Sequence, residues 1–158
     1  MKRHETLIPF SREHHEGLLL AVRLQQGKQA LEQLWSHDPK WQAQYLVKFF
    51  DEHLEQHFDT EERFLFPYAE KAFGENARIV AWLKKEHVDM KSEIDFFRNP
   101  DEKSLEEHLK NFGHLLESHI RCEEREFFPM FEDLVDEETI LDIGRKLKEN
   151  NPHTDGVW

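Results

Sequence analysis

The chain has 158 residues, of which 38% are hydrophobic and 34% charged, and its formal net charge is −12. This length fits one domain, and the acidic balance argues against binding to nucleic acid or docking on an anionic membrane surface. No segment resembles a signal peptide or a membrane span, and the single Cys122 can form no intramolecular disulfide, so we expect a cytoplasmic protein.

Glycine, proline and capping residues divide the chain into segments long enough for helices, and no segment shows sustained strand alternation. The predicted helices run from Ser11 to about His37, from Pro39 to before Pro67, from about Asn76 to near Asn99, from Ser104 to before Pro129, and from Asp136 to about Glu149. We expect an all-α fold, an antiparallel up-down four-helix bundle with a short C-terminal helical extension. The domain would cover residues 1–150, and residues 151–158 would form a flexible tail.

A segment of eleven residues occurs twice, as HFDTEERFLFP at residues 57–67 and as HIRCEEREFFP at residues 119–129, with six identical positions. Both copies contain His-x-x-x-Glu, and no other histidine has a glutamate four residues later. Residues four apart lie on one face of a helix, so each copy directs an imidazole and a carboxylate toward one point. The pairs are His57 with Glu61 and His119 with Glu123. Two such helices facing each other predict a metal site, and one large enough for two metals.

Apolar stripes place these donors on the inner faces of their helices. In the fourth predicted helix the stripe is Leu105, Leu109, Phe112, Leu116, His119, Glu123 and Phe127, and the second helix has the same pattern 62 positions earlier. In the third helix the stripe is Val80, Leu83, His87, Met90, Ile94 and Phe97. An unpaired carboxylate is costly to bury, so the glutamates on these stripes must be paired or bind a metal.

The first predicted helix offers two adjacent candidates, His14 and His15. Leu18 and Val22 follow His15 at the same spacing at which apolar residues follow His87, which favours His15 and leaves His14 as the alternative. The predicted metal ligands are His15, His57, Glu61, His87, His119 and Glu123. Imidazole and carboxylate donors suit iron, with manganese or zinc as substitutes.

In this order of motifs the chain resembles the hemerythrin-like proteins, or HHE cation-binding domains, over about residues 8–135. The resemblance implies an up-down four-helix bundle that holds two iron ions as a non-haem di-iron centre with an oxo or hydroxo bridge. Glu61 and Glu123 would bridge the irons. His15 and His57 would complete one iron, and His87 and His119 the other.

The chain departs from the oxygen-carrying hemerythrins, which have a second histidine four residues from the one on the third helix. Here those positions hold Leu83 and Lys91. The departure argues against reversible oxygen carriage. It favours reaction with, or sensing of, a small diatomic or peroxide ligand (O2, NO or peroxide) by a monomer or homodimer. Iron storage or donation, and a di-iron oxidoreductase that consumes peroxide or nitric oxide, are the alternatives.

Several neighbours of the predicted ligands have open roles. Glu62 and Glu124 are either solvated glutamates or acceptors that orient a ligand histidine. His53, four residues before His57, is expected to flank the site without binding metal. Cys122 is expected to be a plain buried thiol.

Overall fold

The structure is a computed structural model that describes residues 2–27, 31 and 33–150. Within that part of the chain there is no strand, which confirms the all-α class. The α-helices are α1 (Ile8–Gln26), α2 (Pro39–Phe49), α3 (Glu55–Phe64), α4 (Phe66–Ala72), α5 (Arg78–Arg98), α6 (Leu105–Cys122), α7 (Phe128–Leu134) and α8 (Glu137–Asn150). Two π-helical turns, η2 (Phe50–Leu54) and η4 (Glu123–Phe127), and a 3-10 turn, η3 (Gly74–Ala77), join some of them. The predicted tail, residues 151–158, lies outside the described residues.

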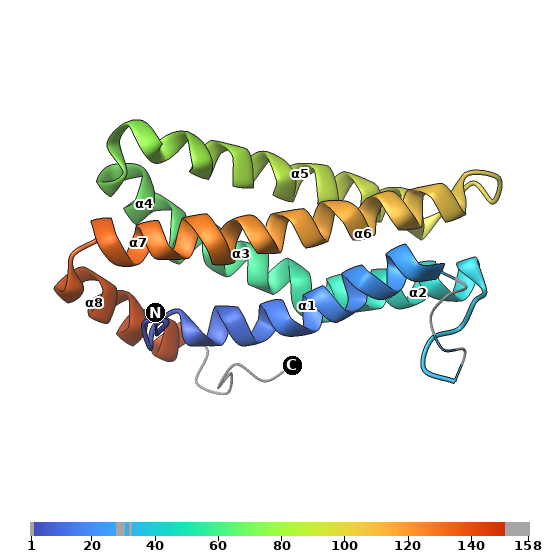
Figure 1. The fold of residues 1–158 in the computed structure, drawn as a ribbon, viewed down its shortest axis with the longest axis horizontal. Coiled ribbons are helices and arrows are strands. Elements are labelled where there is room, and N and C mark those ends of the chain that lie inside the picture. The colour runs from blue at the N-terminus through green and yellow to red at the C-terminus, as the bar shows by residue number, and fades with distance from the viewer. Residues whose placement is uncertain (1, 28–30, 32, 151–158) are drawn as a thin grey trace.

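Four long helical segments run antiparallel to one another and form the bundle (Figure 1). They are α1, the continuous run from α2 to α4, α5, and the run from α6 to α7. Helix α8 packs across the end of the bundle near the N-terminus (Figure 1). It occupies almost the range predicted for the C-terminal extension. No helix in the described ranges is both long and apolar enough to cross a membrane.

The first helix differs from the prediction at both ends. It begins at Ile8 because Pro9 is accommodated in the first turn, where a missing amide hydrogen costs nothing, and Ser11 is therefore no N-cap. It ends at Gln26, well before His37, because Gly27 adopts a φ of 54° that side-chain-bearing residues rarely adopt.

Pro67 and Pro129 were predicted to end the second and fourth helices, but both helices continue past them. A proline inside a helix removes one amide donor and clashes with the carbonyl four residues earlier, so the helix must kink or widen. The chain kinks at Leu65, which has a φ of −113°, and widens into the π turn η4 before Pro129. Glu123 lies in that π turn, a feature that is frequent at functional sites.

The apolar core consists of two clusters separated by a layer of buried polar residues. One cluster includes Leu46, Phe112 and Leu116, and the other includes Leu83 and Phe127. Helix α1 packs closely on α6 through glycine. A Cβ on Gly17 would lie 2.8 Å from Ile120 Cδ1, and one on Gly113 would lie 2.7 Å from the carbonyl oxygen of Ala21.

Candidate metal centre

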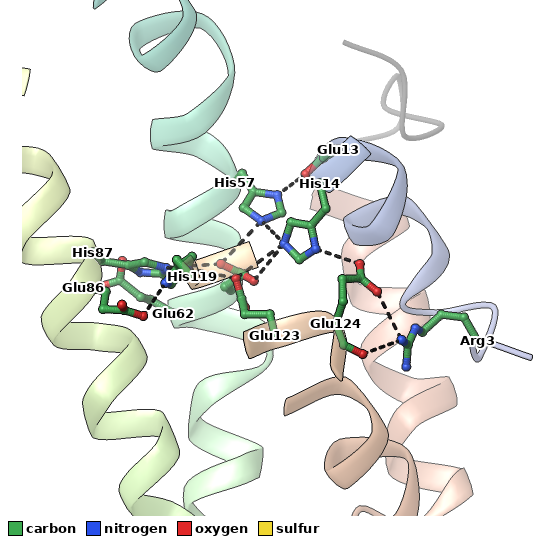
Figure 2. A network of polar contacts seen from close by, with 11 residues as sticks. Arg3, Glu13, His14, His57, Glu62, Glu86, His87, His119, Glu123 and Glu124 are labelled. Atoms are coloured by element: carbon green, nitrogen blue, oxygen red, sulfur yellow. Dashed lines mark hydrogen bonds and ion pairs between the residues drawn. The ribbon is translucent and has the colours of Figure 1, made fainter. Parts of the chain in front are cut away.

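The polar layer between the two apolar clusters contains four histidines and two glutamates whose side chains face one another (Figure 2). Each of these residues is at most 3% exposed. They come from all four segments of the bundle: His14 from α1, His57 and Glu61 from α3, His87 from α5, His119 from α6, and Glu123 from η4. The structure thus brings together five of the six predicted ligands.

The preference for His15 as the residue of the first helix was wrong. His15 is exposed, whereas His14 is 3% exposed and faces the other donors. The buried residues of α1 are Phe10, His14, Gly17, Leu20, Ala21 and Leu24. Its small residues carry little hydrophobic signal, but close packing on α6 requires them. The apolar residues that follow His15 are partly exposed, Val22 by 36%.

The six residues form two groups of four that share both glutamates. One group is His14, His57, Glu61 and Glu123, and the other is Glu61, His87, His119 and Glu123. In each group one donor atom per residue lies within 4.8 Å of the others. His57 Nε2 and His87 Nε2 lie 3.5 and 3.3 Å from the same Glu61 oxygen. His14 Nε2 and His119 Nε2 lie 3.4 and 2.9 Å from one Glu123 oxygen.

Each of the four imidazoles uses its Nδ1 atom to contact a further carboxylate. The partners are Glu124 for His14 at 2.8 Å, Glu13 for His57, Glu62 for His87 at 3.2 Å, and Glu86 for His119 at 3.0 Å. When an imidazole is neutral, donation from Nδ1 leaves its lone pair on Nε2, so these carboxylates favour the tautomer that a metal ligand needs. Glu62 and Glu124 therefore each orient a histidine of the cluster.

The Nε2 atoms then face each other in pairs, at 3.1 Å between His14 and His57 and at 3.2 Å between His87 and His119. Two lone pairs at this separation would repel, so each pair needs a proton or a metal cation between its two nitrogen atoms. The carboxylate oxygens of Glu61 and Glu123 lie beside these nitrogen atoms, but none of them has a well-aligned hydrogen-bond donor in the described part of the chain. Buried polar atoms are normally satisfied, so the arrangement of donors fits metal ions.

The metal-free centre holds protons in the place of cations. Burial and the neighbouring Glu123 raise the pKa of Glu61 to about 8. Burial lowers the pKa of His119, but Glu123 and Glu86 outweigh it and raise this pKa to about 10. Burial also raises the pKa of Glu123, yet His119 and the other partners of Glu123 hold it well below its usual value. Metal binding would displace the protons from Glu61 and His119.

The centre has an internal two-fold relationship that extends beyond the repeated segment. In each copy the histidine and the first glutamate point inward, and the second glutamate contacts a histidine of another helix. The equivalent phenylalanines stack on those same histidines, Phe66 on His87 at 5.5 Å and Phe128 on His14 at 5.4 Å between ring centroids. Residues of α3 and α4 therefore position a histidine of α5, and residues of η4 and α7 position a histidine of α1.

The sequence analysis missed Glu13 and Glu86. Each directly precedes a histidine of the centre, giving a Glu-His pair on α1 and another on α5. Each contacts the histidine supplied by the next helical segment of the bundle. An alignment of these two Glu-His pairs would have identified both glutamates and would also have selected His14 over His15.

The remaining neighbours take no direct part in the cluster. The His53 side chain is 27% exposed and its ring contacts Phe49, with centroids 5.2 Å apart. Cys122 contacts Glu126, and burial together with that carboxylate raises the pKa of the thiol to about 12, which keeps it protonated. The two positions four residues from His87 add no donor to the cluster. Leu83 is buried among apolar residues, and the Lys91 ammonium lies 3.7 Å from the Glu62 carboxylate.

The family comparison agrees with the geometry. A model of the hemerythrin HHE cation-binding domain matches residues 6–131, a range that contains all six inward-facing donors. Comparisons with curated proteins and with solved structures give no match. On the family match, which covers most of the chain, the protein belongs to the hemerythrin HHE cation-binding domain family.

Proposed function

We propose that the protein holds a di-iron centre that reacts with or senses a small species such as O2, NO or peroxide. The observation that carries this proposal is the sharing of Glu61 and Glu123 between two otherwise separate pairs of imidazoles. Two shared carboxylates offset the charge of two neighbouring cations, and a single ion would leave one imidazole pair without a partner.

The donor types support iron. Mixed imidazole and carboxylate donors suit iron, manganese and zinc, and no thiolate is among them. Each group offers four protein donors, which leaves positions open on an iron ion that accepts six. Bound iron would supply one-electron oxidation and reduction, and the open positions would accept a small molecule.

The protein residues around the donors hold the rings and exclude water. Phe58 stacks on His87 with ring centroids 4.0 Å apart, and Phe10 lies edge-on to His57 at 5.8 Å. Together with Phe66 and Phe128 they place apolar surface around every imidazole pair. The enclosure favours chemistry in place over release of iron to an acceptor, because every donor is buried.

Metal content and anomalous scattering test the dinuclear site. Protein loaded with ferrous iron should contain two irons per chain, with two anomalous peaks roughly 3–4 Å apart as in other sites with shared ligands. A single peak bound by three or four of the six residues would contradict the proposal.

Oxygen cycling tests reactivity. The loaded protein is reduced anaerobically, exposed to O2, and then placed under vacuum. Because no fifth imidazole is present in the described structure, we expect rapid oxidation, and the ferrous spectrum should not return. Its return over repeated cycles would identify a reversible carrier instead. Turnover assays with NO and with peroxide would distinguish an oxidoreductase from a sensor.

A further inference from the structure

A row of aromatic side chains follows one face of the helix that leads to the metal centre. Trp41, Tyr45, Phe49 and His53 occur at every fourth position, and the next fourth position is the candidate ligand His57. Successive rings in this aromatic row are in contact. The centroids are 5.3 Å apart for Trp41 and Tyr45, 6.5 Å for Tyr45 and Phe49, and 5.2 Å for Phe49 and His53.

The aromatic row runs from exposed residues to half-buried residues one helical turn from the candidate ligand His57. Its outer members are exposed, Trp41 by 38% and Tyr45 by 39%, and α2 begins at the end of the bundle far from α8 (Figure 1). The inner members, Phe49 and His53, are half-buried. His53 is one helical turn from His57, whose Nε2 faces the centre.

The second copy of the sequence pattern has no counterpart of the aromatic row. The second copy of the pattern lies 62 residues later and has Lys103, Glu107, Asn111 and Leu115 at the equivalent positions before the ligand His119. Packing explains part of the row, because the buried Trp35 lies edge-on to both Trp41 and Tyr45 and fixes the segment before α2. Phe49 also packs on the apolar cluster that includes Leu46. Neither contact requires that the rings continue to His53, one turn before His57.

We infer that the aromatic row is an electron-transfer route between the surface and the metal centre, and this inference rests on the proposed di-iron function. Tyrosine and tryptophan are the side chains most readily oxidised by one electron, and rings in contact couple electronically. Because Tyr45 is 39% exposed, water can take up its phenolic proton when an electron leaves the ring.

The electron balance shows when the route is used. Hydrogen peroxide accepts two electrons and two protons to give two waters. Two ferrous ions supply both electrons, but a pair with one ion already ferric supplies only one. Tyr45 then supplies the second electron through Phe49 and His53, and its phenolic proton is released, leaving a neutral tyrosyl radical. The net reaction is H2O2 + Fe2+ + TyrOH + H+ → 2 H2O + Fe3+ + TyrO•. A soluble donor such as ascorbate returns one hydrogen atom to the radical.

Site-resolved oxidation tests the route. Protein with two irons, half-oxidised, is mixed with hydrogen peroxide without a donor, freeze-quenched for electron paramagnetic resonance, and digested for mass spectrometry. We expect a tyrosyl signal that Tyr45→Phe removes, and oxidation at Trp41 and Tyr45 several-fold above that at Trp82. Trp82 is an internal comparison because it is 57% exposed and only five residues from His87, so exposure and proximity both favour it.

A matched pair of variants tests the connection. Phe49→Leu interrupts the row, and Phe96→Leu changes a second half-buried ring that packs on the same apolar cluster and contacts a histidine outside the row. With two irons bound in both, Phe49→Leu should reduce the radical yield several-fold and Phe96→Leu should leave it unchanged. Ascorbate should suppress oxidation of the wild-type row.

Three outcomes would overturn the inference, and they distinguish failure of the electron route from failure of the di-iron proposal. Oxidation of Trp82 equal to that of Trp41 with two irons bound, or an unchanged radical yield in Phe49→Leu, would overturn the electron route alone. Failure of the chain to retain two irons would overturn the di-iron proposal and the route with it.

Discussion

At the scale of single residues, Arg3 reaches the centre from the far end of the sequence. Its guanidinium donates to the Glu124 carbonyl at 2.9 Å and to the Glu124 carboxylate at 3.1 Å, and it also pairs with Glu132 (Figure 2 shows the contacts with Glu124). The Glu124 carboxylate in turn accepts a hydrogen bond from His14. Among the described residues, the corresponding carboxylate on the other side, Glu62, has only Lys91 at 3.7 Å beside His87, so the two imidazole pairs are supported unequally.

Arg3→Ala should weaken metal binding between His14 and His57 and spare the position between His87 and His119. Loss of a carboxylate that orients a ligand histidine costs about 10–100-fold in metal affinity, and Arg3 acts one step further out, so a smaller loss is expected. Chelator competition followed by metal analysis should show one weakened ion, with Arg3→Lys partly restoring it. Arg145→Ala is the control because Arg145 pairs with Asp142 on the exposed surface. Equal weakening of both ions would contradict the unequal support.

The raised pKa values of Glu61 and His119 predict how metal-free stability depends on pH. A group whose pKa is raised in the folded state stabilises the fold below its ordinary pKa, and this stabilisation is lost as pH rises through the folded value. The windows are 4.5 to about 8 for Glu61 and 6.5 to about 10 for His119. The lowered pKa of Glu123 makes stability depend on pH only below pH 4.5.

Calorimetry of metal-free protein should therefore show a melting temperature that falls between about pH 6 and pH 9. Metal binding strengthens over the same range because it no longer competes with these protons, so the gain in melting temperature on adding metal should increase with pH. A metal-free melting temperature that is constant or rises with pH would contradict the assigned protonation.

Glu61→Ala or Glu123→Ala should release most of the metal, because each substitution removes a carboxylate shared by both groups and leaves two cations with only one of their two common anions. His53→Ala should retain most of it, because His53 lies outside the cluster. Metal analysis of the purified variants measures the difference. Wild-type metal content in either glutamate variant, or complete loss in His53→Ala, would reverse these assignments.

At the scale of the helices, hydrophobic periodicity predicts the inner faces of α5 and α6 because those faces pack through large apolar side chains. It fails for α1, where Gly17 and Ala21 continue the stripe that contains His14. Hydrophobic periodicity detects large apolar side chains, whereas α1 needs small residues in order to approach α6 closely. Five of the six donors were therefore predictable, and the sixth depended on packing distance.

The helix ends were less predictable than the helices. Pro67 and Pro129 are strong local signals for the end of a helix. The apolar faces before and after each proline are buried in the same bundle, however, and this burial stabilises a helix that continues through a kink or a π turn. Of the outer carboxylates, Glu62 and Glu124 could be named as candidates from the repeat. Their partners could not be assigned, because a contact between helices depends on the rotation of both.

Gly113→Ala should destabilise the fold and loosen the His14 side of the centre. The added Cβ would lie 2.7 Å from the backbone oxygen of Ala21, which cannot move aside without shifting α1. Overpacking of this kind costs about 1–3 kcal/mol, of which the higher helix propensity of alanine offsets about 0.5–1. Denaturant unfolding and metal titration measure both effects.

Gly17→Ala is the matched comparison in the same interface. Its Cβ would meet only the terminal methyl group of Ile120, at 2.8 Å, and a side chain of this kind can change rotamer. The cost should therefore be smaller than for Gly113→Ala. A Gly113→Ala protein as stable as wild type, with unchanged metal affinity, would show that α1 can move away from α6 without cost.

At the scale of the whole molecule, the fold class followed from the sequence because each predicted helix has an apolar stripe that only the other helices can cover. The internal two-fold relationship was visible only in part. The repeat at residues 57–67 and 119–129 showed half of it. The equivalence of α1 and α5 became clear only from the structure, in which Phe10, Glu13 and His14 correspond to Leu83, Glu86 and His87.

The enclosure of the donors has a kinetic consequence. All six are at most 3% exposed and come from four separate segments, so a metal ion cannot enter or leave while every segment is packed. Exchange must then wait for an opening of the bundle, and its rate is the frequency of that opening multiplied by the chance of capture before the bundle recloses. Because exchange is this restricted, an ion captured early is retained even when another ion would bind more strongly. Copper and zinc, for example, bind nitrogen and oxygen donors more strongly than ferrous iron does. The metal found in the protein then records which ion was abundant when the chain folded.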